Sequence, residues 1–247
     1  MARIKTNHYI LTGINHFDRF VMHPSILLKF LIAGQIGAAK GAIEISLKDL
    51  STEKFSMESN LEDSQMQTFL GKMGFVSQEF LYRLVRVFKP KLVIETGVHV
   101  GVSSAFILQG LHDNGNGMLY SIDLPLSKFK NPNGKPLNYQ FPRKGDTGFG
   151  VPERLKERWT LLLGDSHYEL PKLLDKLGSC DLFFHDSEHS YENMMFEFST
   201  VFPHLSDNAV VSSDDVSLNN AFRSFCALKN LIPHIVGEQF GFAILKE

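Results

Sequence analysis

The chain has 247 residues, 43% of them hydrophobic, which is enough for the core of one large domain. Its 25 basic and 27 acidic residues leave a formal net charge of -2. There is no basic field to hold a phosphate backbone, so nucleic acid is not an expected partner. The 2 cysteines are too few for a disulfide framework, which indicates a reducing, cytoplasmic protein.

Residues 1–75 mix helical-looking pieces with glycine-rich and polar breaks, and we interpret them as an N-terminal helical extension of unknown role. The most apolar stretch there starts at Ile26, but lysines, glycines and a glutamine interrupt it well short of the roughly 20 apolar residues of a membrane span. The first residues lack an apolar core followed by a small-residue cleavage site. We therefore expect neither a membrane association nor a targeting segment.

Residues 76–247 have the pattern of one α/β domain. Apolar residues recur at helical spacing over 76–88 and predict an amphipathic helix that ends before Pro90. The strand "KLVIE" follows. The next helix is predicted to be capped near Ser103 and to stop at the Asn/Gly run 114–117.

This strand-turn-helix unit recurs along the chain. The runs "MLYSID", "WTLLLGD", "DLFFHD" and "AVVSSDD" predict further strands, and helical patterns over about 167–177, 190–200 and 218–229 separate the later ones. Such alternation predicts a Rossmann-like, doubly wound, mostly parallel sheet. "PHIVGEQFGFAILKE" predicts a C-terminal hairpin that adds an antiparallel strand. The Pro/Gly/Lys-rich segment 124–152 is expected to be a lid-like loop.

Acidic residues stand at the ends of five successive apolar runs. In open parallel sheets ligands bind outside the carboxyl ends of the strands, so we expect these acids to line one site. For any one of them, an N-cap of the next helix is an alternative explanation. The positions are Glu95, Asp123, Asp165, Asp186 and the pair Asp214 and Asp215.

The turn "ETGVHVGVSS" follows a strand and opens a helix, a context in which the backbone closely approaches a nucleotide-type ligand. It departs from the dinucleotide fingerprint G-x-G-x-x-G, because the next glycine after Gly97 is Gly101. Asp123, at the end of the following strand, can accept hydrogen bonds from both hydroxyls of a ribose. A ribose-bearing ligand is therefore expected, and a pyrophosphate is not required.

The chain from about residue 75 to 247 resembles class I S-adenosylmethionine-dependent methyltransferases, in the group of macrolide sugar O-methyltransferases and cephalosporin-hydroxylase-like proteins. The resemblance rests on "VIETGVHVGVSS", "LYSIDLP", "LLLGDS", "HDSEHSYENM" and "VVSSDDV". It implies S-adenosylmethionine as the cofactor, and His99 departs from the smaller residue that is commoner in this glycine motif. The implied cofactor-binding residues are Glu95, Thr96, Gly97, Gly101, Ser103, Asp123, Asp165, Ser166 and Asp186.

The resemblance also implies that Asp186, Asp214 and Asp215 are ligands of a divalent cation. Beside the resemblance, three carboxylates from adjacent strand ends offer hard oxygen ligands suited to Mg²⁺. Such an ion would lower the pKa of a bound hydroxyl. We therefore expect Mg²⁺ or a similar divalent cation as a second cofactor.

Methyl transfer to oxygen requires the acceptor to lose a proton, and His189 and Glu188 stand a few residues past Asp186. His189 is the better base near neutral pH, since the ordinary pKa of histidine is about 6.5, whereas Glu188 would need burial to raise its pKa. The alternative for His189 is a solvent-facing or core histidine. His185 is expected to be structural or to support a site residue.

The predicted function is divalent-metal-dependent O-methylation of a hydroxyl on a small molecule such as a sugar or a phenol. One alternative is an oxidoreductase, in which His185, Asp186 and His189 imitate a two-histidine, one-carboxylate iron site or the sheet holds a nicotinamide cofactor. The missing fingerprint and the acidic pair argue against it. Another alternative, a non-catalytic nucleoside-binding module, leaves the surplus acids unexplained. The sequence does not determine the acceptor or whether copies form a homo-oligomer.

Overall fold

The computed structural model describes residues 75–124, 147–236 and 239–245. The predicted N-terminal extension, except for its last residue, lies outside these ranges, as do residues 125–146 of the predicted lid-like loop. In the part that the structure describes, no helix combines the length and the apolar character needed to cross a membrane.

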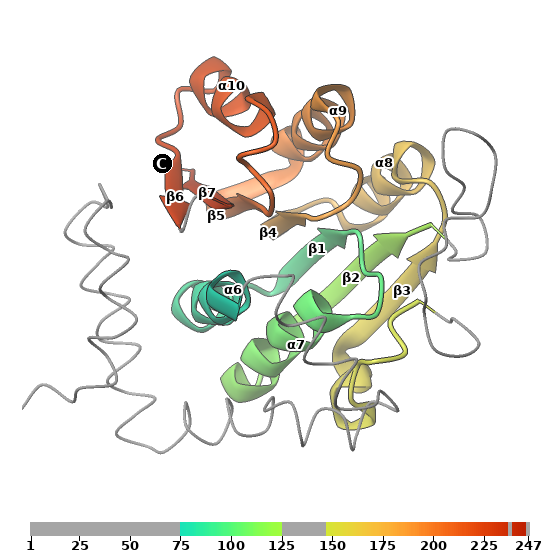
Figure 1. The fold of residues 1–247 in the computed structure, drawn as a ribbon. Helices are drawn as coiled ribbons and strands as arrows, with labels where there is room; N and C mark the ends of the chain where they lie inside the picture. The colour runs from blue at the N-terminus through green and yellow to red at the C-terminus, as the bar shows by residue number, and fades with distance from the viewer. Residues whose placement is uncertain (1–74, 125–146, 237–238, 246–247) are drawn as a thin grey trace, which may run out of the picture.

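Within the described residues, one seven-stranded sheet has the order β3-β2-β1-β4-β5-β7-β6 (Figure 1). The strands are β1 (Leu92–Thr96), β2 (Met118–Asp123), β3 (Trp159–Leu163), β4 (Cys180–His185), β5 (Leu205–Ser213), β6 (His234–Val236) and β7 (Phe240–Ile244). Strands β1 to β5 are parallel, whereas β7 runs antiparallel to both β5 and β6. The predicted doubly wound, mostly parallel sheet with a C-terminal hairpin is confirmed.

Helices cover both faces of the sheet (Figure 1). One face carries α6 (Phe75–Phe88), α7 (Val102–Asn114) and the 3-10 helix η3 (Glu153–Arg158). The other carries α8 (Ser166–Leu177), α9 (Tyr191–Val201) and α10 (Ala221–Leu228), with the short η4 (Phe202–His204) after α9.

Two helix starts differ from their predictions. The N-cap of α7 is Gly101, in the left-handed region, rather than a residue near Ser103. Helix α10 begins at Ala221 rather than near residue 218, because the side-chain oxygen of Asn219 accepts the Ala221 backbone N–H at 2.7 Å.

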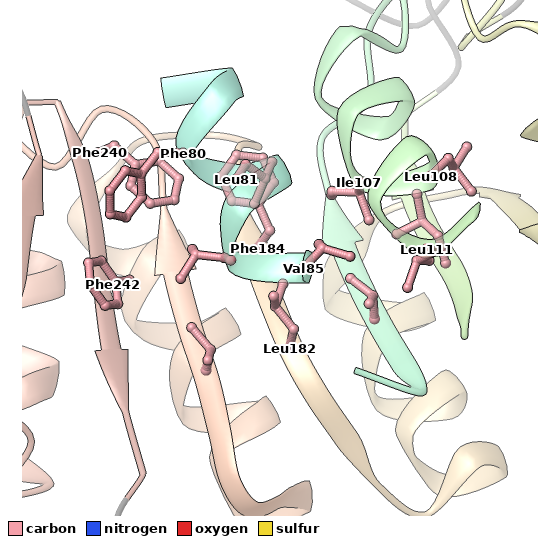
Figure 2. Close-up of a cluster of buried hydrophobic side chains, with 14 of the residues drawn as sticks. Phe80, Leu81, Val85, Ile107, Leu108, Leu111, Leu182, Phe184, Phe240 and Phe242 are labelled. Atoms are coloured by element: carbon pink, nitrogen blue, oxygen red, sulfur yellow. The ribbon is translucent and has the colours of Figure 1, made fainter. Parts of the chain in front are cut away.

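Apolar side chains fill the space on each side of the sheet. On the α6 side, the ring of Phe80 lies 5.8 Å from that of Phe240 and 5.5 Å from that of Phe242, measured between centroids (Figure 2). On the other side, Phe183 meets Phe198 edge-on at 6.2 Å. The central strands are thus buried on both faces, which is why they read as near-continuous apolar runs that end abruptly in polar residues.

The strand order reverses between β1 and β4, and this reversal places the site. Strand β1 pairs with β2 on one side and with β4 on the other. Just beyond the strand ends, a Cβ atom on Gly97 would lie 2.0 Å from the backbone oxygen of Asp186, and Gly97 has φ +84. Only glycine fits there, so the backbones after β1 and β4 meet at the crevice where ligands of such sheets bind.

Candidate active site

The turn after β1 is supported by a second loop. Gly148, from the end of the predicted lid, donates its backbone N–H to the carbonyl of His99 at 2.7 Å. Gly150 donates in the same way to Val100 at 2.9 Å. A Cβ on Gly101 would lie 3.1 Å from the Cα of Gly148. The described end of the 124–152 segment is therefore part of the scaffold of the glycine turn.

Asp123 also holds this turn. Its Oδ2 accepts the backbone N–H of His99 at 2.7 Å, and the residue is 7% exposed. Burial raises the pKa of Asp123 above its ordinary value, and hydrogen bonds from backbone amides offset only part of that rise. Ribose binding by Asp123 stays a prediction. The sequence did not reveal that the same carboxylate also binds the backbone of the glycine turn at His99.

Glu95 lies beneath the turn and bonds within the protein. Its carboxyl oxygens accept hydrogen bonds from the hydroxyls of Ser103, Ser104 and Ser121, each at 2.6 Å. The indole nitrogen of Trp159 donates to Ser121 at 2.9 Å. Burial raises the pKa of Glu95 to about 7, against the effect of the serine hydroxyls. Glu95 and Ser103, two of the predicted cofactor residues, thus bind each other and join β1 to the start of α7.

A second buried acid, Glu197 of α9, connects several segments of the site. Its Oε2 accepts from the Thr96 hydroxyl at 2.5 Å and lies 2.7 Å from Nδ1 of His185. Its Oε1 accepts from the Ser187 hydroxyl at 2.8 Å. Burial alone would raise the pKa of Glu197, but the hydrogen bond and charge of His185, with hydrogen bonds from Thr96 and Ser166, lower it below its ordinary value.

Asp165 shows that the N-cap alternative was correct for one of the strand-end acids. Its side chain accepts the backbone N–H of His167 at 2.9 Å and caps α8. Asp165 is exposed, and the neighbouring Ser166 bonds to Glu197. A contact of Asp165 or Ser166 with the adenine of a cofactor stays a prediction.

His189 lies close to carboxylates from two neighbouring strand ends. Its Nε2 is 3.7 Å from Oδ1 of Asp186 and 3.6 Å from Oδ2 of Asp215. The carbonyl of His189 accepts a hydrogen bond from the Asn219 side chain at 2.9 Å. The structure therefore brings the predicted base together with two of the three predicted metal ligands.

Burial and the neighbouring acids raise the pKa of Asp186 well above the ordinary value. Burial has the largest effect, followed by the negative charges of Asp214, Glu95, Asp215 and Asp123. A carboxyl group in such surroundings keeps its proton unless a positive charge comes near. The strand-end acids thus favour a cationic ligand.

His189 has the opposite perturbation. Burial, and then the charge of His185, lower the pKa of His189, while Asp215 and Glu197 oppose this change. The imidazole is therefore neutral near neutral pH and able to take a proton. Glu188, the other predicted catalytic residue, has an exposed side chain.

The three predicted metal ligands lie at the ends of two neighbouring strands. Asp186, Asp214 and Asp215 follow β4 and β5 as expected. However, in the described part of the chain no three or more His, Cys, Asp or Glu side chains are placed to hold a metal ion. His185 is fully buried with Nδ1 directed at Glu197, so it does not form an open iron-binding face with Asp186 and His189. The divalent cation stays a prediction that the present donor geometry does not support.

Sequence reasoning missed Glu197 and Asn219. A signal for Glu197 was available, since it occupies the apolar stripe of its helix between Met194 and Val201. A lone acid on such a stripe requires buried donors. Asn219 carried no comparable signal, because its contact with His189 joins two loops that are distant in sequence.

Comparison with known families gives one match. Residues 94–216 fit the family model described as a methyltransferase domain. No curated protein matches the chain.

Solved structures with a similar fold include two of CalS11, one described as calicheamicin methyltransferase and one as TDP-rhamnose 3'-O-methyltransferase. The first has a TM-score of 0.51 at 18% identity, and the match covers 84% of this chain and 93% of that chain. The second has a TM-score of 0.50 at 17% identity, and the match covers 84% of this chain and 95% of that chain. The O-methyltransferase TomG from Streptomyces achromogenes, in complex with SAM, has a TM-score of 0.47 at 16% identity, covering 79% of this chain and 88% of its own. At these identities, the likeness to CalS11 confirms the Rossmann-like fold.

Proposed function

We propose that this chain, whose residues 94–216 fit the model of a methyltransferase domain, transfers a methyl group from S-adenosylmethionine to a hydroxyl of a small molecule, with His189 as the base. The observation that carries the proposal is the position of His189. Its imidazole is uncharged near neutral pH and lies at the carboxyl edge of the sheet, within 3.7 Å of two carboxylates from β4 and β5.

Proposed cofactor contacts follow the strand ends. The turn at Gly97 would receive the amino-acid part of the cofactor, with Glu95 acting through the turn that it supports. Asp123 would bind the ribose hydroxyls, and the start of α8 at Asp165 would lie near the adenine. The support is the close backbone approach at Gly97 and the carboxylate of Asp123 beside the turn.

The negative charge at the carboxyl edge of the sheet favours binding of S-adenosylmethionine over binding of S-adenosylhomocysteine. S-adenosylmethionine carries a positively charged sulfonium, whereas the sulfur of S-adenosylhomocysteine is neutral. Burial, and then the negative charges of Asp214, Glu95 and Asp215, raise the pKa of Asp186 well above its ordinary value. A sulfonium nearby would offset that repulsion.

The chemical step needs one proton acceptor. The acceptor oxygen attacks the methyl carbon, the carbon–sulfur bond breaks with its electron pair going to sulfur, and the hydroxyl proton passes to Nε2 of His189. The products are a methyl ether and S-adenosylhomocysteine. Because the described carboxylates do not form a metal-binding group, no step is assigned to a metal.

The acceptor class is a hydroxylated small molecule such as a sugar or a phenol. CalS11 is described as an enzyme that methylates TDP-rhamnose, and TomG as an O-methyltransferase of tomaymycin synthesis. The description of CalS11 agrees with the acceptor class proposed for this chain. Cytoplasmic location, assembly and the lack of nucleic-acid partners stay predictions of the sequence.

The first test is calorimetric titration of the full chain with S-adenosylmethionine, S-adenosylhomocysteine and NADH. We expect the first two to bind and NADH not to bind, and the reverse result would favour the oxidoreductase alternative. Transfer of a labelled methyl group to a panel of sugars and phenols then identifies the acceptor class.

Metal dependence is measured in the same transfer assay with excess chelator. Unchanged turnover would agree with His189 acting alone. Loss of turnover that added Mg²⁺ restores would show that the reaction requires a divalent cation. The matched variant is Asp215→Asn, which keeps the shape of the side chain and removes its charge.

A further inference from the structure

The indole ring of Trp159 lies against the segment that supports the glycine turn. This segment is 147–151, and all of its residues except Phe149 are buried. A Cβ atom on Gly148 would lie 2.2 Å from Cη2 and 3.0 Å from Cζ2 of Trp159. There is no room for a side chain at residue 148, so the backbone of the segment packs directly on the ring.

A hydrogen bond fixes the orientation of this ring. The indole nitrogen of Trp159 donates to Oγ of Ser121 at 2.9 Å, and the Ser121 hydroxyl donates to Glu95 at 2.6 Å. Ser121 and Glu95 are both fully buried. The ring is thus held at its nitrogen and packed at its other end, and it cannot turn aside without losing one of these contacts.

The same segment also contacts the glycine turn. Gly148 donates its backbone N–H to the carbonyl of His99 at 2.7 Å. Gly150 donates to the carbonyl of Val100 at 2.9 Å. A Cβ on Gly101 would lie 3.1 Å from the Cα of Gly148. Gly148 is therefore in contact with the turn and with Trp159 at once.

His99 explains why the turn needs this support. Its backbone is left-handed, with φ 55, a conformation that residues other than glycine rarely adopt unless their surroundings hold it. Asp123 accepts the N–H of His99, and Gly148 donates to its carbonyl, each at 2.7 Å. Without the second contact the turn could relax. A cofactor would then bind only the fraction of molecules whose turn keeps its present conformation.

We propose that Trp159 and Gly148 are positioning residues, which hold the glycine turn in its cofactor-binding conformation and thereby raise the affinity for S-adenosylmethionine. The inference rests on the proposed function, which makes this turn part of the cofactor site. Neither residue is assigned a contact with the cofactor. Their effect passes through the hydrogen bonds from residues 148 and 150 to the turn.

The first experiment compares Gly148→Ala with Gly178→Ala by calorimetric titration with S-adenosylmethionine and S-adenosylhomocysteine. The two glycines have φ +73 and +76, but a Cβ on Gly178 would have no described atom within 4 Å. The control therefore reproduces the backbone strain without the collision. We expect Gly148→Ala to weaken binding of both compounds at least about tenfold, the scale of an overpacked contact. Gly178→Ala should bind them like the wild type.

The same comparison in a Trp159→Leu background identifies the cause of the loss. Leucine removes the ring that the new Cβ would meet, so Gly148→Ala should then weaken binding no more than Gly178→Ala does. Such non-additivity is expected of two residues in direct contact. Trp159→Leu alone should weaken binding by about 2- to 30-fold, the range for residues that affect a ligand without touching it.

The methyl-transfer assay separates positioning from a merely structural role. In Gly148→Ala the KM for S-adenosylmethionine should rise, whereas kcat at saturating cofactor should be unchanged, because the turn takes no part in the proposed proton transfer. A variant that is only less stable changes neither constant while it remains folded. Urea unfolding of each variant verifies that condition.

Amide hydrogen exchange tests the wild type without any substitution. If the segment favours cofactor binding, linkage requires that bound cofactor favours the contact between segment and turn by the same factor. Exchange of the Gly148 and Gly150 amides should therefore slow at least about tenfold with saturating S-adenosylhomocysteine. The Gly178 amide, which donates to Leu174 at 2.8 Å at the far end of α8, should not respond.

Equal affinities in Gly148→Ala and Gly178→Ala would overturn this inference. So would exchange at Gly148 and Gly150 that ignores saturating cofactor, and this measurement decides if Gly148→Ala does not fold. An equal loss of affinity from Gly148→Ala with and without Trp159→Leu would remove Trp159 from the proposal. Each of these results leaves the proposed function intact, whereas a wild type that binds neither compound would refute both.

Discussion

Glu95→Gln tests how a buried acid beneath the glycine turn couples folding to pH. Burial raises the pKa of Glu95 from 4.5 to about 7. Between those pH values the folded protein holds a proton that the unfolded chain has released. The stability that the protonated Glu95 contributes is therefore complete below about pH 4.5, and it is lost as the pH rises through about 7. The rise in pKa corresponds to about 3 kcal/mol, at about 1.4 kcal/mol per pH unit.

The assay is urea unfolding of the wild type and Glu95→Gln at several values from about pH 4.5 to about pH 8. Glutamine keeps the size of the side chain, and the hydroxyls of Ser103, Ser104 and Ser121 can still donate to its oxygen. Other groups titrate in both proteins, so the difference between the two free energies of unfolding isolates Glu95. We expect the variant to gain about 3 kcal/mol relative to the wild type between the two ends of the range. A difference that does not change with pH would refute this reasoning.

Three further predictions concern the site. His189→Ala should lower kcat by roughly 10² to 10⁴. Because burial lowers the pKa of His189, the acidic limb of the wild-type pH–rate profile should lie below about pH 6.5. An identical limb in the variant would show that another group is the base. Asp123→Ala should weaken S-adenosylmethionine binding at least about tenfold in calorimetry, because it loses the ribose acceptor and the bond to the His99 amide; unchanged affinity would contradict the placement of the ribose. Gly97→Ala should abolish cofactor binding, since its Cβ would lie 2.0 Å from a backbone oxygen, whereas Gly115→Ala, which is equally left-handed but has nothing within 4 Å, should bind the cofactor normally.

The strand-end acids show which features of the site could be predicted from the sequence. That Asp186 and Asp215 would lie at one edge of the sheet was predictable, because parallel strands end at the same edge. For His189, the sequence predicted only that it would lie near these acids. The pKa of His189 is lowered as a base requires, but the cause is burial and the charge of His185. The sequence suggested a nearby cation as one cause of such a lowering, but the degree of burial of a single side chain depends on the tertiary structure.

By itself, the sequence determined the order of strands and helices, the doubly wound sheet and the position of the glycine turn, because these follow from periodicities of two and 3.6 residues and from local turn chemistry. Only the tertiary structure decided what each carboxylate does there. Glu95 is saturated by serine hydroxyls, Asp165 caps a helix, and Glu197 meets a threonine 101 positions away. The physical reason is that the charge and proton affinity of an acid depend on its desolvation and on the donors around it, and both are set by contacts between segments that are remote in sequence.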